Sequence, residues 1–205
     1  MTTFALIRHA EHRLVGHTMV GRASGVRLSP EGVGQAERLA ERLAGSSIGA
    51  LYSSPLERAV HTAVAIAARV GVEVEVAEEL NEIEFGAWTN RTLEDLRPVE
   101  EWRRFNLFRS GSEIPGGEMM VEVQGRMLRL IERLCRVHPE QAVALVSHGD
   151  VIKATLAHYL GVPLDLFHRI GISPASLSIV RIERYGPEVL LINGFVEDGL
   201  LGREA

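Results

Sequence analysis

The sequence is poor in cysteine, in aromatic residues and in positive charge. Its single cysteine, Cys135, excludes an internal disulfide and a cysteine-based metal site, as is usual in a reducing cytoplasm. Only 5% of the residues are aromatic, and the formal net charge is −5 at pH 7. This charge argues against a general binder of nucleic acids or anionic membranes, although a local cluster of arginines could still hold an anionic substrate.

Long hydrophobic runs are also missing. No stretch is long enough to cross a bilayer, and the N-terminus is too polar, with too brief an apolar run, for a signal peptide. We therefore expect a soluble, cytoplasmic protein that does not bind membranes. Of the 205 residues, 46% are hydrophobic, which is enough for one sizeable core, so a single domain over residues 1–205 is expected.

Short apolar runs alternate along the chain with helical patterns. The runs at Phe4–Ile7, Ala50–Tyr52 and Ala142–Val146 are typical of strands buried on both faces of a parallel sheet. Strands that alternate with helices form βαβ units. The sequence therefore predicts an α/β fold, a three-layer α/β/α sandwich with a mostly parallel sheet.

The first expected helix lies in "LSPEGVGQAERLAERLAG". Ser29 is its predicted N-cap, Pro30 takes the first helical position, and Gly45 can end it. The helical period predicts one apolar face, made of Val33, Ala36, Leu39, Ala40 and Leu43.

A second helix with the same design is expected in "SSPLERAVHTAVAIAARVG". Ser54 is the predicted N-cap, Pro55 follows it, and Gly71 ends the helix. The remaining expected elements are helices over about Glu118–Val137 and Asp150–Leu160, and a hairpin of strands over Ser176–Ile182 and Val189–Ile192.

The stretch from about residue 81 to 117 has weak periodicity and holds both tryptophans, Trp88 and Trp102. We interpret it as an insertion over the carboxyl edge of the sheet that forms a lid on a pocket, with the tryptophans as packing residues. The tail from about residue 198 to 205 is expected to be loose.

Charged residues follow the predicted strands at the points where the strands end. Arg8 and His9 follow the first strand, Arg58 lies in the first helical turn after the second, and His148 follows the strand at 142–146. The carboxyl ends of parallel strands meet at one edge of a sheet, where ligands bind. Two arginines, two histidines and nearby helix N-termini suit a tetrahedral oxyanion, above all phosphate.

Two kinds of chemistry are open to these histidines. Metal binding is disfavoured because an adjacent arginine places a fixed positive charge where a cation would sit. A nucleophilic histidine that attacks phosphorus fits better, with arginines neutralising the phosphoryl oxygens. A leaving alkoxide also needs a proton, and "ELNEIEFGAW" offers Glu79, Glu82 and Glu84 beside aromatic residues that would raise a carboxyl pKa.

These segments resemble the histidine phosphatase superfamily, also called the phosphoglycerate mutase-like family. The matching segments, in the family's order, are "LIRHAE", "LSPEGVGQA", "SSPLERAVHTA", "LNEIEFGAW", "PGGE" and "LVSHG". Six matches in one order over most of the chain are a specific signal, whereas any one of them alone would be weak.

The resemblance implies roles for five residues. His9 would be the phospho-accepting nucleophile, and Arg8 and Arg58 would bind the phosphoryl oxygens. His148 would complete the pocket as a catalytic and phosphate-binding residue. Glu82 would protonate the leaving group and then activate water, with Glu84 as the less favoured alternative. The family uses no metal and no organic cofactor.

Three positions concern the floor and rim of the pocket. Ala10 replaces the family's glycine, and His12 replaces its usual Thr or Ser. Arg22 matches a position that often touches substrate, and His12 is a further candidate substrate contact. From the sequence pattern alone, without the resemblance, His12 and His17 are interpreted as surface or loop residues.

The leading prediction is a phosphatase that hydrolyses small phosphomonoesters through phosphohistidine, with a small phosphorylated metabolite as its partner. A phosphoglycerate mutase, a protein-phosphohistidine phosphatase and a non-catalytic phosphate-binding protein remain alternatives. Arg103, Arg104 or Arg109 could meet a second acidic group on the substrate, although a solvated helix face is the simpler interpretation of each. The sequence leaves the oligomeric state open, a homodimer included.

Overall fold

The computed structural model describes residues 1–194 and 201. Six strands form one sheet in the order β3-β2-β4-β1-β5-β6, and the first four of these are parallel. The hairpin β5–β6 adds an antiparallel edge next to β1. The strand bounds are Thr2–Arg8 (β1), Ile48–Ser53 (β2), Val74–Val76 (β3), Ala142–Ser147 (β4), Leu177–Glu183 (β5) and Gly186–Gly194 (β6).

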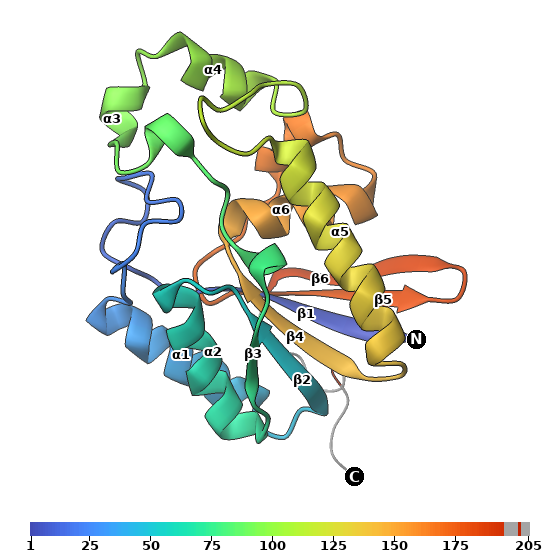
Figure 1. Cartoon of the computed structure of the whole chain (residues 1–205). Helices are drawn as coiled ribbons and strands as arrows, with labels where there is room; N and C mark the ends of the chain where they lie inside the picture. Colours follow the sequence, from blue (N-terminus) through green and yellow to red (C-terminus); the bar gives the residue numbers. More distant parts are fainter. Residues whose placement is uncertain (195–200, 202–205) are drawn as a thin grey trace.

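Helices cover both faces of this sheet, so the predicted three-layer α/β sandwich is confirmed (Figure 1). Side chains of β1 alternate between the two cores because successive residues of a strand point to opposite faces. Phe4 and Leu6 pack with α5 and α6, whereas Ala5 and Ile7 pack with α1 and α2. The helix bounds are Pro30–Leu43 (α1), Glu57–Val70 (α2), Leu93–Leu96 (α3), Glu100–Leu107 (α4), Met120–Val137 (α5) and Gly149–Leu160 (α6).

Helix α1 begins as predicted. The Ser29 side chain accepts a hydrogen bond from the Gly32 N–H at 3.0 Å, and Pro30 is the first helical residue. The prediction for Val33 was wrong, because its side chain is 47% exposed. Gly32 occupies the inward position of the first turn, against the backbone of Glu11, and leaves Val33 on the solvent side.

Helix α2 does not begin as predicted. It starts at Glu57 with Leu56 as its N-cap, and no side chain caps it. Ser54 therefore is not the N-cap. Its hydroxyl instead lies 2.8 Å from Nε2 of His148, the residue that follows β4. The C-terminal prediction was correct, since Gly71 ends the helix in the left-handed conformation, at φ 74°.

The two later helices and the hairpin were also predicted correctly in position. Strand β3 was not predicted, because its three residues are half-buried or exposed and carry little apolar signal. Most of the expected loose tail, residues 198–205, lies outside the described residues; Leu201 is described and is buried. No helix in the described part of the chain is long and apolar enough to span a membrane.

The segment between residues 81 and 117 contains α3 and α4 and lies beyond the carboxyl ends of the strands (Figure 1). Its tryptophans are packing residues, as predicted: the rings of Trp88 and Trp102 meet edge to face at 5.3 Å, and Phe105 packs against Trp88 at 5.4 Å. That the segment acts as a lid stays a prediction.

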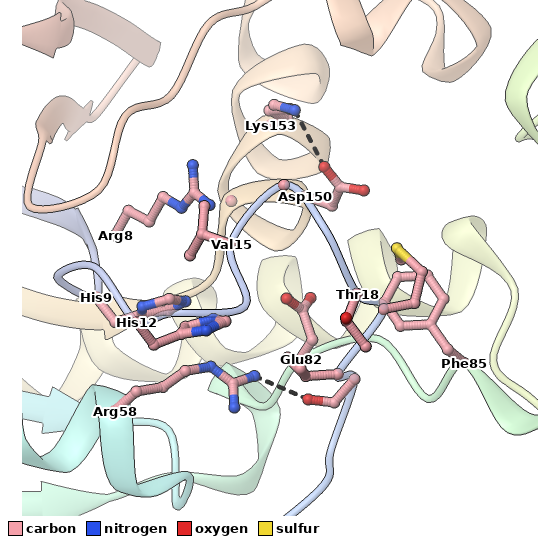
Figure 2. A pocket seen from close by; sticks show the side chains of 15 residues that line it. Arg8, His9, His12, Val15, Thr18, Arg58, Glu82, Phe85, Asp150 and Lys153 are labelled. Carbon is pink, nitrogen blue, oxygen red and sulfur yellow. Dashed lines mark hydrogen bonds and ion pairs between the residues drawn. The ribbon is translucent and has the colours of Figure 1, made fainter. Parts of the chain in front are cut away.

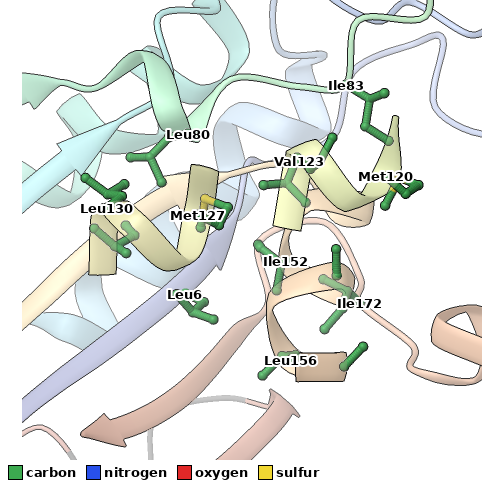
Figure 3. Close-up of a cluster of buried hydrophobic side chains, with 14 of the residues drawn as sticks. Leu6, Leu80, Ile83, Met120, Val123, Met127, Leu130, Ile152, Leu156 and Ile172 are labelled. Atoms are coloured by element: carbon green, nitrogen blue, oxygen red, sulfur yellow. The ribbon is translucent and has the colours of Figure 1, made fainter. Parts of the chain in front are cut away.

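The entry to this segment is anchored in the core between α5 and the sheet. Leu80 and Ile83 are completely buried there, among side chains such as Val123 and Met127 of α5 (Figure 3). These two anchors flank Glu82 and hold its backbone in place beside the ends of β1 and β4.

Candidate active site

A cavity of about 180 Å³ lies beyond the carboxyl ends of β1 and β4. The loop from residue 15 to 21 forms one side of it, and the start of α6 forms another (Figure 2). Five of the seven predicted site residues line this cavity, whereas His148 and Arg22 do not. The five are Arg8, His9, His12, Arg58 and Glu82.

The His9 ring is held in one tautomer by its own loop. Its Nδ1 lies 2.7 Å from the carbonyl oxygen of Ala10, which can only accept a hydrogen bond. Nδ1 therefore carries the proton, and Nε2 keeps its lone pair. Burial lowers the pKa of His9 well below its ordinary value, and the charge of Arg58 lowers it further. The ring is thus neutral near pH 7, which is the form that a nucleophile requires.

Ala10 fits the floor of the site without strain. Its φ is not positive, so the backbone has a conformation that alanine adopts readily. Its side chain is completely buried in the core under α1 and α2. The Thr62 hydroxyl accepts a hydrogen bond from its N–H at 3.0 Å. The glycine of the family pattern is therefore not required at this position.

Arg8 and Arg58 line the cavity, and three of their guanidinium nitrogens have no hydrogen-bond partner. Arg58 is completely buried and donates to the carbonyl of Gly21 at 2.8 Å, while Arg8 donates to the carbonyl of Ile172 at 2.7 Å. Nε of Arg8, and Nε and Nη1 of Arg58, have no partner within the described chain although they are buried. Unsatisfied buried donors cost free energy, and charged donors cost most, so an anion is the complement that this geometry requires.

Glu82 is the carboxyl group of the acidic segment that reaches the cavity. Its Oε1 accepts a hydrogen bond from the Ile83 N–H at 2.9 Å. Burial raises the pKa of Glu82 above its ordinary value, and the nearby Asp150 adds to the rise, while Arg58 opposes it. Glu84 lies outside the cavity lining, with a side chain that is 39% exposed, so Glu82 is the one of the two that reaches the cavity, and its role as the acid stays a prediction.

His148 lies behind the cavity wall and is completely buried. Arg58 Nη2 lies 3.4 Å from Nδ1 of His148. Because a guanidinium can only donate, Nδ1 is the acceptor and Nε2 carries the proton, which it donates in a hydrogen bond to the Ser54 hydroxyl at 2.8 Å. Its ring centroid lies 5.1 Å from that of His9, and Oε2 of Glu82 is 3.7 Å from Nδ1. Burial and Arg58 lower the pKa of His148 well below its ordinary value. The phosphate-binding role of His148 stays a prediction.

His12 lies in a loop, as predicted, but it is not a surface residue. Its side chain is 5% exposed and lines the cavity, with its ring stacked on that of His9 at 5.4 Å. The Leu14 N–H donates to Nδ1 at 3.3 Å, so Nε2 carries the proton of the neutral ring. Burial, together with Arg58 and Arg8, lowers the pKa of His12 to about 4. His17 is exposed, as predicted.

Arg22 lies behind Glu82, outside the cavity lining. Its Nε donates to the backbone carbonyl of Glu82 at 2.7 Å, and Nη2 donates to Glu118 at 2.9 Å. These bonds hold the segment that carries the acid, and the predicted contact of Arg22 with substrate stays a prediction.

Sequence reasoning missed two charged residues of the cavity, Asp150 and Lys153. Both come from the first turns of α6 and line the wall across from His9 and His12 (Figure 2). In the sequence they appear only as charged residues at the start of a helix, and no signal shows which way they face. Among the described residues, no group of three or more His, Cys, Asp and Glu side chains is arranged to hold a metal.

Comparisons with known proteins agree on one family. Residues 4–194 match the sequence profile of the histidine phosphatase superfamily (branch 1). Phosphoserine phosphatase 1 of Hydrogenobacter thermophilus is 32% identical over 198 residues, covering 94% of this chain and 92% of the relative. The probable phosphoglycerate mutase GpmB of Yersinia pestis is 31% identical over 177 residues, covering 85% and 82%.

A solved structure shows the same likeness in three dimensions. A mutant phosphoserine phosphatase of Entamoeba histolytica, in complex with phosphoserine, superimposes with a TM-score of 0.85 at 27% identity. The match covers 94% of this chain and 97% of that one.

Proposed function

The chain belongs to the histidine phosphatase superfamily, and from this premise we propose that it hydrolyses small phosphomonoesters through a phosphohistidine on His9. One observation carries the proposal. Three buried guanidinium nitrogens of Arg8 and Arg58 have no hydrogen-bond partner, and both arginines line the same cavity as His9. The ring of His9 keeps one nitrogen, Nε2, without a proton. A phosphoryl group supplies the acceptors and the electrophile that this arrangement lacks.

The first step is transfer of the phosphoryl group to His9. The lone pair of Nε2 attacks phosphorus, and the bond between phosphorus and the ester oxygen breaks. Arg8 and Arg58 neutralise the phosphoryl oxygens during the transfer. The leaving alkoxide takes the proton of Glu82. Because the pKa of Glu82 is raised, a fraction of the molecules keeps this carboxyl protonated at pH values above its ordinary pKa.

The second step is hydrolysis of the phosphohistidine. The Glu82 carboxylate, left without its proton, takes one from a water molecule, and that water attacks phosphorus. The bond between phosphorus and Nε2 breaks, inorganic phosphate leaves, and both His9 and protonated Glu82 are regenerated. No metal or cofactor enters either step.

Two further histidines are assigned supporting roles in the proposal. His12 carries a proton on Nε2 at the cavity lining and would donate it to a phosphoryl oxygen. His148 contacts Arg58 and lies beside His9, so it would hold both groups in place from behind the cavity wall.

The phosphoglycerate mutase activity suggested by the Yersinia relative is the second candidate, because it shares the phosphohistidine step. A mutase returns the phosphoryl group to the product, whereas a phosphatase passes it to water. Release of inorganic phosphate from 3-phosphoglycerate without formation of 2-phosphoglycerate supports the phosphatase. Isomerisation with little phosphate release would support the mutase.

The nucleophile is tested by His9→Ala. We expect this variant to lose turnover of p-nitrophenyl phosphate while its thermal unfolding midpoint stays close to that of the parent protein. His17→Ala, which changes an exposed histidine, is the matched control and should keep full turnover. Acid-labile phosphoprotein, trapped by rapid quenching, should form in the parent protein and not in His9→Ala. Unchanged turnover in His9→Ala would contradict the assignment.

A further inference from the structure

The wall of the cavity across from His9 is built from the first turns of α6. Lys153 and Asp150 both line the cavity there, one helical turn apart, and Lys153 Nζ lies 3.1 Å from Asp150 Oδ1 (Figure 2). Their side chains are 23% and 25% exposed, so both remain accessible from the cavity. The proposed reaction uses neither residue.

The charge of Asp150 is already balanced from behind. Arg109 Nη1 lies 3.4 Å from Asp150 Oδ2, and the Arg109 side chain is only 9% exposed. The guanidinium carbon sits 4.3 Å from the centroid of the Phe105 ring and 4.4 Å from that of Phe167. Arg109 is thus held between two rings and cannot swing into the cavity.

The wall therefore carries two cations for one carboxylate. Arg109 faces Asp150 from the protein side, which leaves the positive charge of Lys153 as the surplus that faces the cavity. The arginines suggested by the sequence do not take this place: Arg103 and Arg104 are exposed outside the cavity lining, and Arg109 lies behind Asp150.

We propose that Lys153 binds a carboxylate of the substrate, so that this site prefers small phosphomonoesters of hydroxy acids, amino-acid derivatives included. The inference rests on the proposed function for the position of the phosphoryl group, which His9 and Arg58 hold across the cavity from Lys153 (Figure 2). A cavity of about 180 Å³ holds a phosphoryl group and a short carbon chain. An anion at the far end of such a chain meets Lys153.

Pairs of substrates that differ only in the carboxylate test this inference. One pair is 3-phosphoglycerate and glycerol 3-phosphate, and the other is O-phosphoserine and O-phosphoethanolamine. We define the selectivity ratio as kcat/KM for the acid divided by kcat/KM for its carboxylate-free partner. The parent protein should show a ratio well above one for both pairs.

Lys153→Met keeps the apolar stem of the side chain and removes its charge. We expect the selectivity ratio to fall about tenfold to a hundredfold, which is the usual effect of losing a charged hydrogen bond. Lys153→Arg keeps the charge and should restore part of the ratio. Arg104→Gln removes an exposed cation outside the cavity lining and should leave the ratio unchanged. An unchanged ratio in Lys153→Met would overturn the inference.

Binding to His9→Ala separates this inference from the proposed function. Isothermal titration should show tighter binding of 3-phosphoglycerate than of glycerol 3-phosphate, and Lys153→Met in the same background should abolish the difference. If the parent protein binds with this preference but releases no phosphate, the proposed function fails and the inference stands. Equal binding of both ligands to His9→Ala overturns the inference whether or not the protein is active.

Discussion

At the scale of single residues, the site depends on where two protons lie. In the proposed reaction His9 must keep Nε2 free of a proton, and the carbonyl of Ala10 achieves this by accepting a hydrogen bond from Nδ1–H. Glu82 must hold a proton at the start of the reaction, which its burial favours by raising its pKa. Opposite shifts in neighbouring groups are the pattern expected of a nucleophile beside a general acid.

If Glu82 is the general acid, the loss of kcat/KM in Glu82→Gln should depend on the leaving group of the substrate. Glutamine cannot supply a proton, so kcat/KM for an alkyl phosphomonoester should fall by about 10²- to 10⁴-fold. The loss should be much smaller for p-nitrophenyl phosphate, because p-nitrophenolate leaves without needing a proton. Steady-state kinetics with the two substrates measures the difference.

The pH profile gives the same test a second readout. Because the protonated acid is consumed in the first step, kcat/KM for the alkyl ester should decline as pH rises through the raised pKa of Glu82. This decline should be absent in Glu82→Gln and present in Glu84→Gln, which changes the neighbouring carboxyl outside the cavity lining. Equal losses for both substrates, or an unaltered profile, would show that Glu82 is not the acid.

At the scale of elements, the start of α1 supports the loop that carries the histidines. The Ser29 N–H donates to the carbonyl of Glu11 at 2.9 Å, two residues after His9. A Cβ on Gly32 would lie 2.0 Å from that carbonyl oxygen, so only glycine allows the helix to approach this closely. The geometry of the loop therefore depends on Gly32, which lies 23 positions after His9 in the sequence.

Gly32→Ala is expected to destabilise the protein, although alanine normally favours a helix. Backbone atoms must move apart to admit the methyl group, and such overpacking costs about 1–3 kcal/mol of the free energy of unfolding. Gly34→Ala is the matched control in the same helix, because its methyl group would meet only the flexible end of Arg38, at 3.1 Å. That substitution should be neutral or stabilising by up to about 1 kcal/mol.

Chemical denaturation of the two variants measures these changes, and turnover of p-nitrophenyl phosphate reports on the loop. Turnover should fall in Gly32→Ala and stay near that of the parent protein in Gly34→Ala. If both variants have the same stability, α1 does not hold the loop in the way described.

At the scale of the whole molecule, the site makes the fold sensitive to acid. His9, His12 and His148 are all buried, and each has a lowered pKa for which burial is the largest cause. In the unfolded chain these residues take up protons near pH 6.5. The folded protein binds fewer protons below that pH, so its free energy of unfolding falls as the pH falls.

We expect the free energy of unfolding to decline from pH 6.5 downward, and the decline to continue to about pH 4, where folded His12 itself titrates. Urea denaturation at a series of pH values measures the slope. His12→Asn should make the slope shallower, whereas His17→Asn, at an exposed position, should not. Equal slopes in the two variants would contradict this account.

Much of the fold follows from local patterns in the sequence. Apolar runs marked the three central strands, Ser29 and Pro30 marked the start of α1, and Gly71 marked the end of α2. These signals are reliable because they depend on burial of both faces of a strand and on backbone conformation at helix ends. Since parallel strands share one carboxyl edge, the meeting of Arg8, His9 and Arg58 could also be predicted.

Other features were decided by contacts between distant segments. Ser54 resembles a helix cap in sequence, yet it bonds to His148. Val33 continues an apolar stripe in sequence, yet Gly32 takes the buried position of the first turn and leaves Val33 exposed. His12 is polar and lies in a loop, and only the packing of that loop over His9 buries it.

The sequence by itself determined the α/β architecture, the edge at which the candidate site lies and the meeting of Arg8, His9 and Arg58 at that edge, because these follow from periodicity and from the order of the strands. Only the tertiary structure decided which nitrogen of His9 is free and which of the glutamates reaches the cavity. It also decided that Lys153, rather than an arginine of the segment 81–117, faces the far end of the cavity. Side-chain direction and burial depend on neighbours that are distant in sequence, and no local pattern encodes them.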